Sequence, residues 1–364
     1  MRAFADSISQ SSDLTFSPAD DGPVPLMKRL SVIKNICALL CLLLVLCGCG
    51  SGTNPSLTKT VFCMDTLLTI TASGARAEEA LERSEQELFR LDALLNRHSQ
   101  TSTVSELNRV GSLKNHELAG LLRRVLFLNE STCGAFDCTL APLIDIWDIA
   151  GGGHVPTSEE LSAALALTGT GSRITVSDDT VTLVPGTALD LGGVGKGYAG
   201  ELVRTIFSEC GVSGSICLGG DNCLVGPRSA EQPLWRVGLR MPGSQDDIVC
   251  ILSVTDTFIV TSGSYERFFK ADDDTVYHHI LDPETGWPAQ NGLVSVTVLT
   301  NDGVAADALA TAFFVMGEEK TKAWLLSHPD VSAILITEDH RITFSSALSD
   351  VLTQESEAYS YEAF

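Results

Sequence analysis

The segment V-S-V-T-V-L-T-N-D-G-V-A-A-D-A-L-A-T-A-F-F-V-M, residues 294–316, joins an apolar strand to a buried helix. The alternation at 294–299 predicts the strand, and the apolar run at 304–316 predicts the helix. Asp307 and Thr311 are four residues apart, so they lie on one helical face. Their carboxylate and hydroxyl are hard oxygen donors that suit Mg²⁺ better than zinc. An alternative stays open, because an aspartate near a helix start is often an N-cap or a partner of the helix dipole.

Strand patterns around this segment come in runs and do not alternate strictly with helices. This order favours an α+β fold, a single catalytic domain with mixed or antiparallel sheets flanked by helices, over a doubly wound sheet. Strands are predicted at 60–72, 174–184, 216–225, 235–239, 248–254, 258–261, 294–299 and 333–336, and helices at 76–95, 118–131, 156–167, 304–316 and 319–327.

Both ends of the chain are predicted to lie outside that domain, which we place at 60–350. Residues 1–26 are expected to be a non-native leader, with the true start at Met27. Residues 27–48 have basic residues before a short apolar run and end before Cys49, the pattern of a lipoprotein signal peptide. The run is too short to span a bilayer. We therefore expect lipidation at Cys49, a tether over 49–59, and an acidic, disordered tail over 351–364.

Composition limits the partners of the chain. The formal net charge is −22, which excludes nucleic acid and anionic lipid headgroups as general partners. A phosphate-bearing ligand must then be held by a local device such as a metal, backbone amides or a few lysines. Outside the signal the cysteines lack a C-x-x-C pair and are predicted to be core residues, although a Cys217–Cys223 bridge stays open.

A glycine-rich segment, D-L-G-G-V-G-K-G-Y-A at 190–199, follows a predicted strand that ends at Leu191. Its bare backbone can approach a pyrophosphate closely, and Lys196 adds a positive charge. A Rossmann fingerprint fits the letters at 195–200 but lacks the surrounding βαβ pattern, and a P-loop is excluded because Gly197 follows the lysine. A purely structural glycine turn is the remaining alternative.

His279 is the best candidate for a general acid or base, because an imidazole can accept a hydroxyl proton near neutral pH. His278 competes with it. Neighbouring strand residues point to opposite faces, so only one of the two can face a site. A serine nucleophile beside Gly263 is discounted, since no G-x-S-x-G pattern is present.

Taken together, a series of blocks between Met64 and Gly317 resembles the ApbE family, the FAD:protein FMN transferases. The blocks run in family order: M-D-T-L-L-T-I (64–70), S-E-L-N (105–108), G-A-F-D-C-T-L-A-P-L-I-D-I-W (134–147), the glycine segment, L-G-G-D (218–221), W-R-V-G-L-R-M-P (235–242), T-S-G-S-Y-E-R-F-F (261–269), H-H-I-L-D-P-E-T-G-W-P-A (278–289) and A-D-A-L-A-T-A (306–312). The resemblance also implies an ApbE-like α+β fold related to the T-fold.

The resemblance implies roles for residues at matching positions. The FAD-binding positions are Met64, Ala135, Phe136, Asp137, Asp190, Lys196 and His279. The implied metal ligands are the Gly193 carbonyl, Asp307 and Thr311, and catalysis is assigned to His279 and Asp307. In one departure from the family pattern, the aromatic residue common four positions before S-E-L is Thr101 here. Trp147 is a candidate to supply the missing stacking.

The implied reaction is Mg²⁺-dependent transfer of FMN from FAD to a threonine or serine hydroxyl of an acceptor protein, with release of AMP. The acceptor would be a membrane redox subunit or a secreted flavoprotein. The enzyme would be held by its lipid at the extracytoplasmic face of the cell membrane. Alternatives are an FAD pyrophosphatase that forms FMN and AMP, and a non-catalytic FAD-binding lipoprotein.

Overall fold

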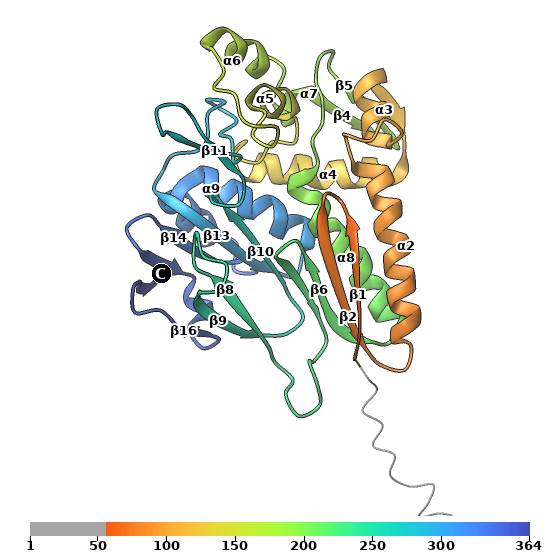
Figure 1. Cartoon of the computed structure of the whole chain (residues 1–364). Helices are drawn as coiled ribbons and strands as arrows, with labels where there is room; N and C mark the ends of the chain where they lie inside the picture. Colours follow the sequence, from red (N-terminus) through yellow and green to blue (C-terminus); the bar gives the residue numbers. More distant parts are fainter. Residues whose placement is uncertain (1–55) are drawn as a thin grey trace, which may run out of the picture. The chain divides into compact units, whose positions relative to one another are not determined.

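The computed structural model describes residues 56–364, so the predicted leader, signal peptide and Cys49 lie outside the described residues. Its centre is a nine-stranded sheet in the order β1-β2-β6-β7-β10-β13-β14-β15-β17 (Figure 1). The strands are β1 Ser56–Cys63, β2 Thr66–Ser73, β6 Ser213–Leu218, β7 Asp221–Val225, β10 Phe258–Gly263, β13 Leu293–Thr300, β14 Ser332–Thr337, β15 Arg341–Phe344 and β17 Ser360–Ala363. Neighbours pair antiparallel except β15 and β17, which are parallel.

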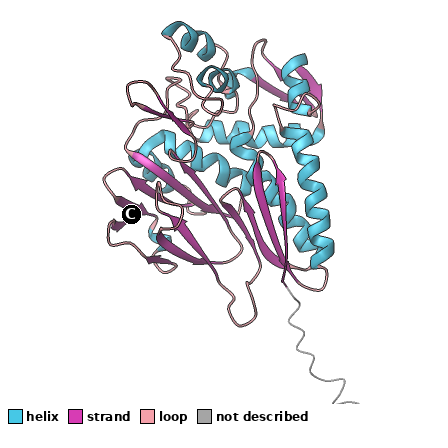
Figure 2. Cartoon of the chain, in the orientation of Figure 1, coloured by secondary structure: helices cyan, strands magenta, loops and turns pink. Residues whose placement is uncertain are grey.

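Helices cover one face of this sheet and a smaller sheet covers part of the other (Figure 2). The helices are α2 Ala77–Leu95, α3 Thr103–Val110, α4 His116–Ser131, α8 Gly192–Cys210 and α9 Gly303–Leu325. The smaller sheet has the order β16-β9-β8, with β16 Leu352–Gln354, β9 Ile248–Val254 and β8 Trp235–Arg240. None of the helices in the described part of the chain is long and apolar enough to cross a membrane.

The remaining elements lie around this framework. They are α5 Ala141–Trp147, α6 Ser158–Leu165, α7 Thr170–Arg173, the short sheet of β3 Ser112–Lys114, β5 Thr180–Leu183 and β4 Ile174–Ser177, the hairpin of β11 Phe268–Lys270 and β12 Val276–His278, and the 3₁₀ turn η1 Ser346–Leu348. Helix α6 begins with a capping box, in which the Thr157 side chain accepts the Glu160 N–H and the Glu160 side chain accepts the Thr157 N–H. The predicted α+β class with mixed sheets is therefore confirmed.

Helix α9 is the central helix, and it is apolar nearly all round because it packs against α8, α4 and the sheet. Its first turn approaches α8 very closely. A Cβ on Gly197 of α8 would lie 1.9 Å from the Gly303 carbonyl oxygen, so only glycine fits there. The predicted break between two helices is confirmed at Gly317, whose φ of 77° interrupts α9.

Several predicted boundaries were wrong. The strand predicted at 60–72 is the β1-β2 hairpin, whose turn residues Met64 and Asp65 both have positive φ. Residues 174–184 and 216–225 also form hairpins, and no strand ends at Leu191, because the strand before α8 is β5, which ends at Leu183. The turns at Met64–Asp65 and Asp178–Asp179 contain no glycine, so each of these two hairpins resembled one strand. The third hairpin was missed although its turn is Gly219–Gly220.

The two predicted ends of the domain also need correction. Residues 56–59 belong to β1 and not to a tether, and the tail at 351–364 is ordered in β16 and β17. Tyrosines anchor this tail: Tyr359 is buried, and the Tyr361 hydroxyl donates to the Val249 carbonyl at 2.6 Å. The prediction of disorder rested on the acidic composition of the tail and did not take these tyrosine contacts into account. The seven cysteines in the described residues are free, so the Cys217–Cys223 bridge is absent.

Candidate functional site

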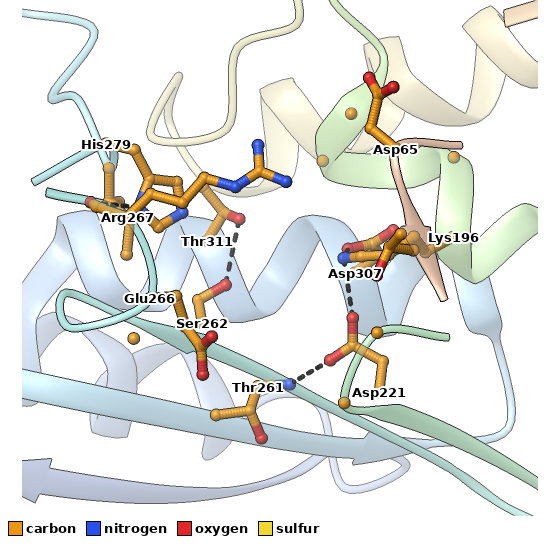
Figure 3. Close-up of a pocket in the computed structure, with 18 of the residues that line it drawn as sticks. Asp65, Lys196, Asp221, Thr261, Ser262, Glu266, Arg267, His279, Asp307 and Thr311 are labelled. Atoms are coloured by element: carbon orange, nitrogen blue, oxygen red, sulfur yellow. Dashed lines mark hydrogen bonds and ion pairs between the residues drawn. The ribbon is translucent and has the colours of Figure 1, made fainter. Parts of the chain in front are cut away.

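A cavity of about 610 Å³ opens beside the ends of central-sheet strands, next to α8 and α9 (Figure 3). This volume is in the range of pockets for small molecules and cofactors. The start of α8, one face of α9, the end of β10 and the turns of the β1-β2 and β6-β7 hairpins line it. Predicted site residues in its wall are Met64, Phe136, Asp137, Asp190, Gly193, Lys196, His279, Asp307 and Thr311.

Asp307 and Thr311 lie one turn apart on α9 and face this cavity, as predicted. Asp307 does not cap the helix, because the N-cap is Asp302, whose side chain accepts the Ala305 N–H. Asp307 is only 3% exposed, and its Oδ2 accepts the Gly197 N–H at 2.9 Å. The hydroxyl of Thr311 lies 3.3 Å from that of Ser262.

Gly193 completes a set of oxygen donors. A Cβ built on Gly193 would lie 4.0 Å from the Thr311 hydroxyl and 3.0 Å from the Phe136 ring, so a side chain would fill this space. In a regular α-helix the N–H of Gly197 would donate to the carbonyl of Gly193. Here that N–H donates a hydrogen bond to Asp307 Oδ2. A carbonyl oxygen has two lone pairs, so that of Gly193 can accept a helical hydrogen bond and still bind a cation. A carboxylate, a hydroxyl and a carbonyl form a set that fits Mg²⁺.

Lys196 lies between two buried carboxylates (Figure 3). Its Nζ is 2.7 Å from Asp221 Oδ2 and 3.3 Å from Asp307 Oδ1. Burial would lower the pKa of Lys196, but Asp307 and Asp221 outweigh that effect and raise it, so the ammonium stays charged. Burial, together with the nearby charge of Asp307, raises the pKa of Asp221 despite the lysine.

The strand predicted to end at Leu191, just before the glycine segment, is absent. Gly192 begins α8 directly, and the following glycines form its first turns. Asp190 lies just before this start, where its Oδ1 accepts the Gly192 N–H at 2.8 Å and its Oδ2 accepts from Arg97 Nε at 2.6 Å. The glycines thus serve close packing against α9 as well as exposure of backbone groups.

The triplet at 135–137 divides between two roles. Phe136 lines the cavity with its ring, but Ala135 does not belong to the cavity wall and packs against the core. Asp137 reaches the wall, yet its carboxylate accepts hydrogen bonds from the backbone and hydroxyl groups of Thr139 and Thr170. Its first task is therefore to hold this loop in place.

The two histidines point to opposite sides, as predicted. His279 lines the cavity, and its Nδ1 lies 3.1 Å from the Arg267 carbonyl, which fixes a proton on Nδ1 and leaves Nε2 as the basic nitrogen. Burial lowers the pKa of His279 to about 4, so the ring is neutral at physiological pH. His278 is buried against Phe314 and lies 3.0 Å from the Ala289 carbonyl.

Trp147 does not replace the missing aromatic residue. It is fully buried in a cluster with Phe269, Tyr277 and Trp287, and its indole N–H donates to the Gly286 carbonyl at 2.8 Å. Tryptophan in an apolar cluster is a core residue when its N–H finds a partner there. The suggestion that Trp147 stacks on a ligand was wrong.

Comparisons with known proteins identify the family of this chain. The sequence profile of the ApbE family matches residues 64–335. The chain belongs to the ApbE family. A Treponema pallidum protein named FAD:protein FMN transferase is 33% identical over 353 residues, covering 89% of this chain and 96% of that protein. The crystal structure of an ApbE protein from Thermotoga maritima aligns with a TM-score of 0.76 at 28% identity, covering 83% of this chain and 100% of that one.

A second solved structure supports the same family. The flavin transferase ApbE from Vibrio cholerae aligns with a TM-score of 0.72 at 26% identity, covering 82% of this chain and 100% of that one. The resemblance carried by the blocks between 64 and 317 is thus confirmed, and with it the ApbE-like fold.

Sequence reasoning missed charged residues that line the cavity of this ApbE-family chain. Asp221 forms an ion pair with Lys196, and Arg97 forms one with Asp190. Arg240 and Arg267 also line the cavity. Two of these cations pair with carboxylates of the cavity wall, Arg97 with Asp145 and Asp190 and Arg240 with Glu266. The block L-G-G-D contained Asp221, but only the fold brings it to Lys196.

Proposed function

We propose that this ApbE-family enzyme transfers FMN from FAD to a threonine or serine hydroxyl of an acceptor protein in a Mg²⁺-dependent reaction. The observation that carries the proposal is the set of Asp307, Thr311 and Gly193 oxygens in the same cavity as Lys196 and His279. Its relatives from Treponema pallidum and Vibrio cholerae bear the corresponding names.

The residues of the cavity have distinct tasks in this reaction. Asp307, Thr311 and the Gly193 carbonyl would hold Mg²⁺, which neutralises the charge of the FAD pyrophosphate when bound. Lys196 adds a positive charge beside that site, and Phe136 offers an aromatic face. Met64 lies at the hairpin turn against Gly195, where it closes one side of the cavity.

The bonds of the proposed step balance without a further reactant. The acceptor hydroxyl oxygen forms a bond to the phosphorus of the FMN half, and the P–O–P bridge breaks. AMP leaves with the bridging oxygen, so a phosphoester joins FMN to the acceptor. Nε2 of His279 would take the hydroxyl proton, since the Nδ1 contact with the Arg267 carbonyl leaves Nε2 as the basic nitrogen.

Mass spectrometry of the purified enzyme with FAD, Mg²⁺ and a candidate acceptor tests this function. The expected products are an acceptor that carries one FMN and an equal amount of AMP, both abolished by a chelator. FMN and AMP formed without an adduct would indicate an FAD pyrophosphatase. FAD that stays intact and bound in the presence of Mg²⁺ would indicate a binding protein without chemistry.

We also propose that the enzyme acts at the extracytoplasmic face of the cell membrane, held by lipid on Cys49. The lipoprotein signal pattern at 27–48 supports this location. An acceptor that is a membrane redox subunit or a secreted flavoprotein would then meet the enzyme in the same compartment.

A further inference from the structure

Asp221 is a buried carboxylate at the site for which the proposed reaction has no task. It is the first residue of β7, directly after the Gly219–Gly220 turn, and only 5% exposed. Its Oδ1 accepts the Thr261 N–H at 2.9 Å, and its Oδ2 lies 2.7 Å from Lys196 Nζ. Both oxygens are therefore held in a fixed direction.

In the neighbouring carboxylate, Asp307, one oxygen is the proposed metal ligand and also the partner of the Lys196 ammonium. Its Oδ2 is bound by the Gly197 N–H, so Oδ1 is the atom left for a metal ion. The same Oδ1 lies 3.3 Å from Lys196 Nζ. An ammonium on a flexible four-carbon stem would pair fully with this oxygen if nothing else held it, and a buried pair of that kind would compete with a divalent cation.

We propose that Asp221 is a positioning residue that holds the Lys196 ammonium away from Asp307 Oδ1, so that this oxygen can bind a divalent cation while the lysine stays in the cavity. The inference rests on the proposed function for the identity of the metal site. The distances support it, because the ammonium is closer to Asp221 than to Asp307.

The charges of the three groups fit the same assignment. Two carboxylates and one ammonium leave a single negative charge, which attracts a divalent cation into a buried site. Once that cation is bound, the cluster is positive and suits the anionic pyrophosphate of FAD. Without Asp221 the lysine would neutralise Asp307 and remove this attraction.

Asp221→Asn is the primary test, because its amide keeps an oxygen for the Thr261 N–H and replaces the charged oxygen that faces Lys196 with an uncharged NH₂ group. Mn²⁺ serves as the probe, with free Mn²⁺ measured by electron paramagnetic resonance in the absence of FAD. We expect the dissociation constant for Mn²⁺ to rise about tenfold, which corresponds to about 1.4 kcal/mol. Unchanged Mn²⁺ binding would overturn the proposal.

A double-mutant cycle with Lys196→Met separates positioning from direct action on the metal. Lys196→Met should bind Mn²⁺ at least as tightly as the wild type, since the competing cation is gone. Adding Asp221→Asn to that variant should then have an effect several-fold smaller than in the wild type. Equal effects in both backgrounds would mean that Asp221 binds or attracts the metal itself, and weaker Mn²⁺ binding by Lys196→Met would exclude competition.

Glu318→Gln provides a matched control for loss of a carboxylate. Glu318 lies on α9, as Asp307 does, and pairs with two cations, Lys322 and Arg341. It does not line the cavity. This variant should unfold at lower temperature yet bind Mn²⁺ as the wild type does. FMN transfer is assayed separately: absence of transfer with the expected Mn²⁺ cycle would reject the proposed reaction and leave the role of Asp221 intact.

Discussion

At the scale of single residues, Asp307 is the charged group of the proposed metal site. Asp307→Ala should reduce FMN transfer by about 10³-fold or more, because metal stabilisation of a developing charge is worth several kcal/mol. Thr311→Val should cost less, about tenfold, since a neutral ligand is lost. Initial rates against Mg²⁺ concentration, with circular dichroism as the check on folding, measure both. Full Mg²⁺-dependent activity in either variant would contradict the metal assignment.

The protonation of His279 determines how the rate of FMN transfer should depend on pH. Burial lowers its pKa from 6.5 to about 4, so the basic form persists as the pH falls through 6.5 and is lost only near 4. Transfer should therefore show no inflection near 6.5 that depends on His279. His279→Asn should slow single-turnover transfer by about 10²- to 10⁴-fold at neutral pH with near-normal FAD affinity.

The neighbouring histidine is the control for that prediction. His278→Asn should lower the melting temperature, because it removes the buried contact to the Ala289 carbonyl and packing against Phe314. The folded fraction should keep its transfer rate. A rate loss equal to that of His279→Asn, or a loss of FAD affinity alone in the His279 variant, would show that the proton goes elsewhere.

At the scale of elements, the crossing of α8 and α9 depends on glycine. A Cβ at Gly197 would lie 1.9 Å from the Gly303 carbonyl oxygen, so Gly197→Ala must push the helices apart. We expect the free energy of unfolding to fall by about 1–3 kcal/mol, the usual cost of overpacking. Gly120→Ala on α4 is the control, because no atom lies within 4 Å of its added Cβ.

The free energy of unfolding should fall in Gly197→Ala and should stay the same or rise in Gly120→Ala. Alanine is a better helix former than glycine by about 1 kcal/mol, so Gly120→Ala should be neutral or stabilising. Urea unfolding of both proteins measures the difference. A stable Gly197→Ala variant would mean that the helices can separate without cost, and that the glycines of the segment 190–199 are there for the ligand alone.

The elements also show what the sequence could predict. Helices α2 and α4 followed from apolar periodicity and the first part of α9 from its apolar run, because these signals are local. The turn at Met64 and Asp65 was missed because both residues adopt positive φ without glycine. Pairing of Lys196 with Asp221 depends on sheet order, which no local pattern contains.

At the scale of the whole molecule, the site is assembled from distant parts of the chain. Asp307, Thr311 and His279 were found because their motifs are compact, whereas Arg97 meets Asp190 across 93 residues. The tail was wrongly predicted to be disordered because composition was weighed there without its tyrosine anchors. Local chemistry was therefore predictable, and partners supplied by the tertiary fold were not.

The last prediction concerns attachment of the whole enzyme to a membrane. The proposed anchor is lipid on Cys49, which lies outside the described residues. Cys49→Ser in the full chain should move the enzyme from the membrane fraction to the soluble fraction, because acyl chains supply about 0.8 kcal/mol of binding for each buried CH₂ group. Purified Cys49→Ser enzyme should transfer FMN normally, since the catalytic residues all lie between 64 and 311. Membrane association that survives both this substitution and removal of the lipid would reject the lipoprotein proposal, whereas loss of transfer in the soluble variant would show that the anchor also takes part in catalysis.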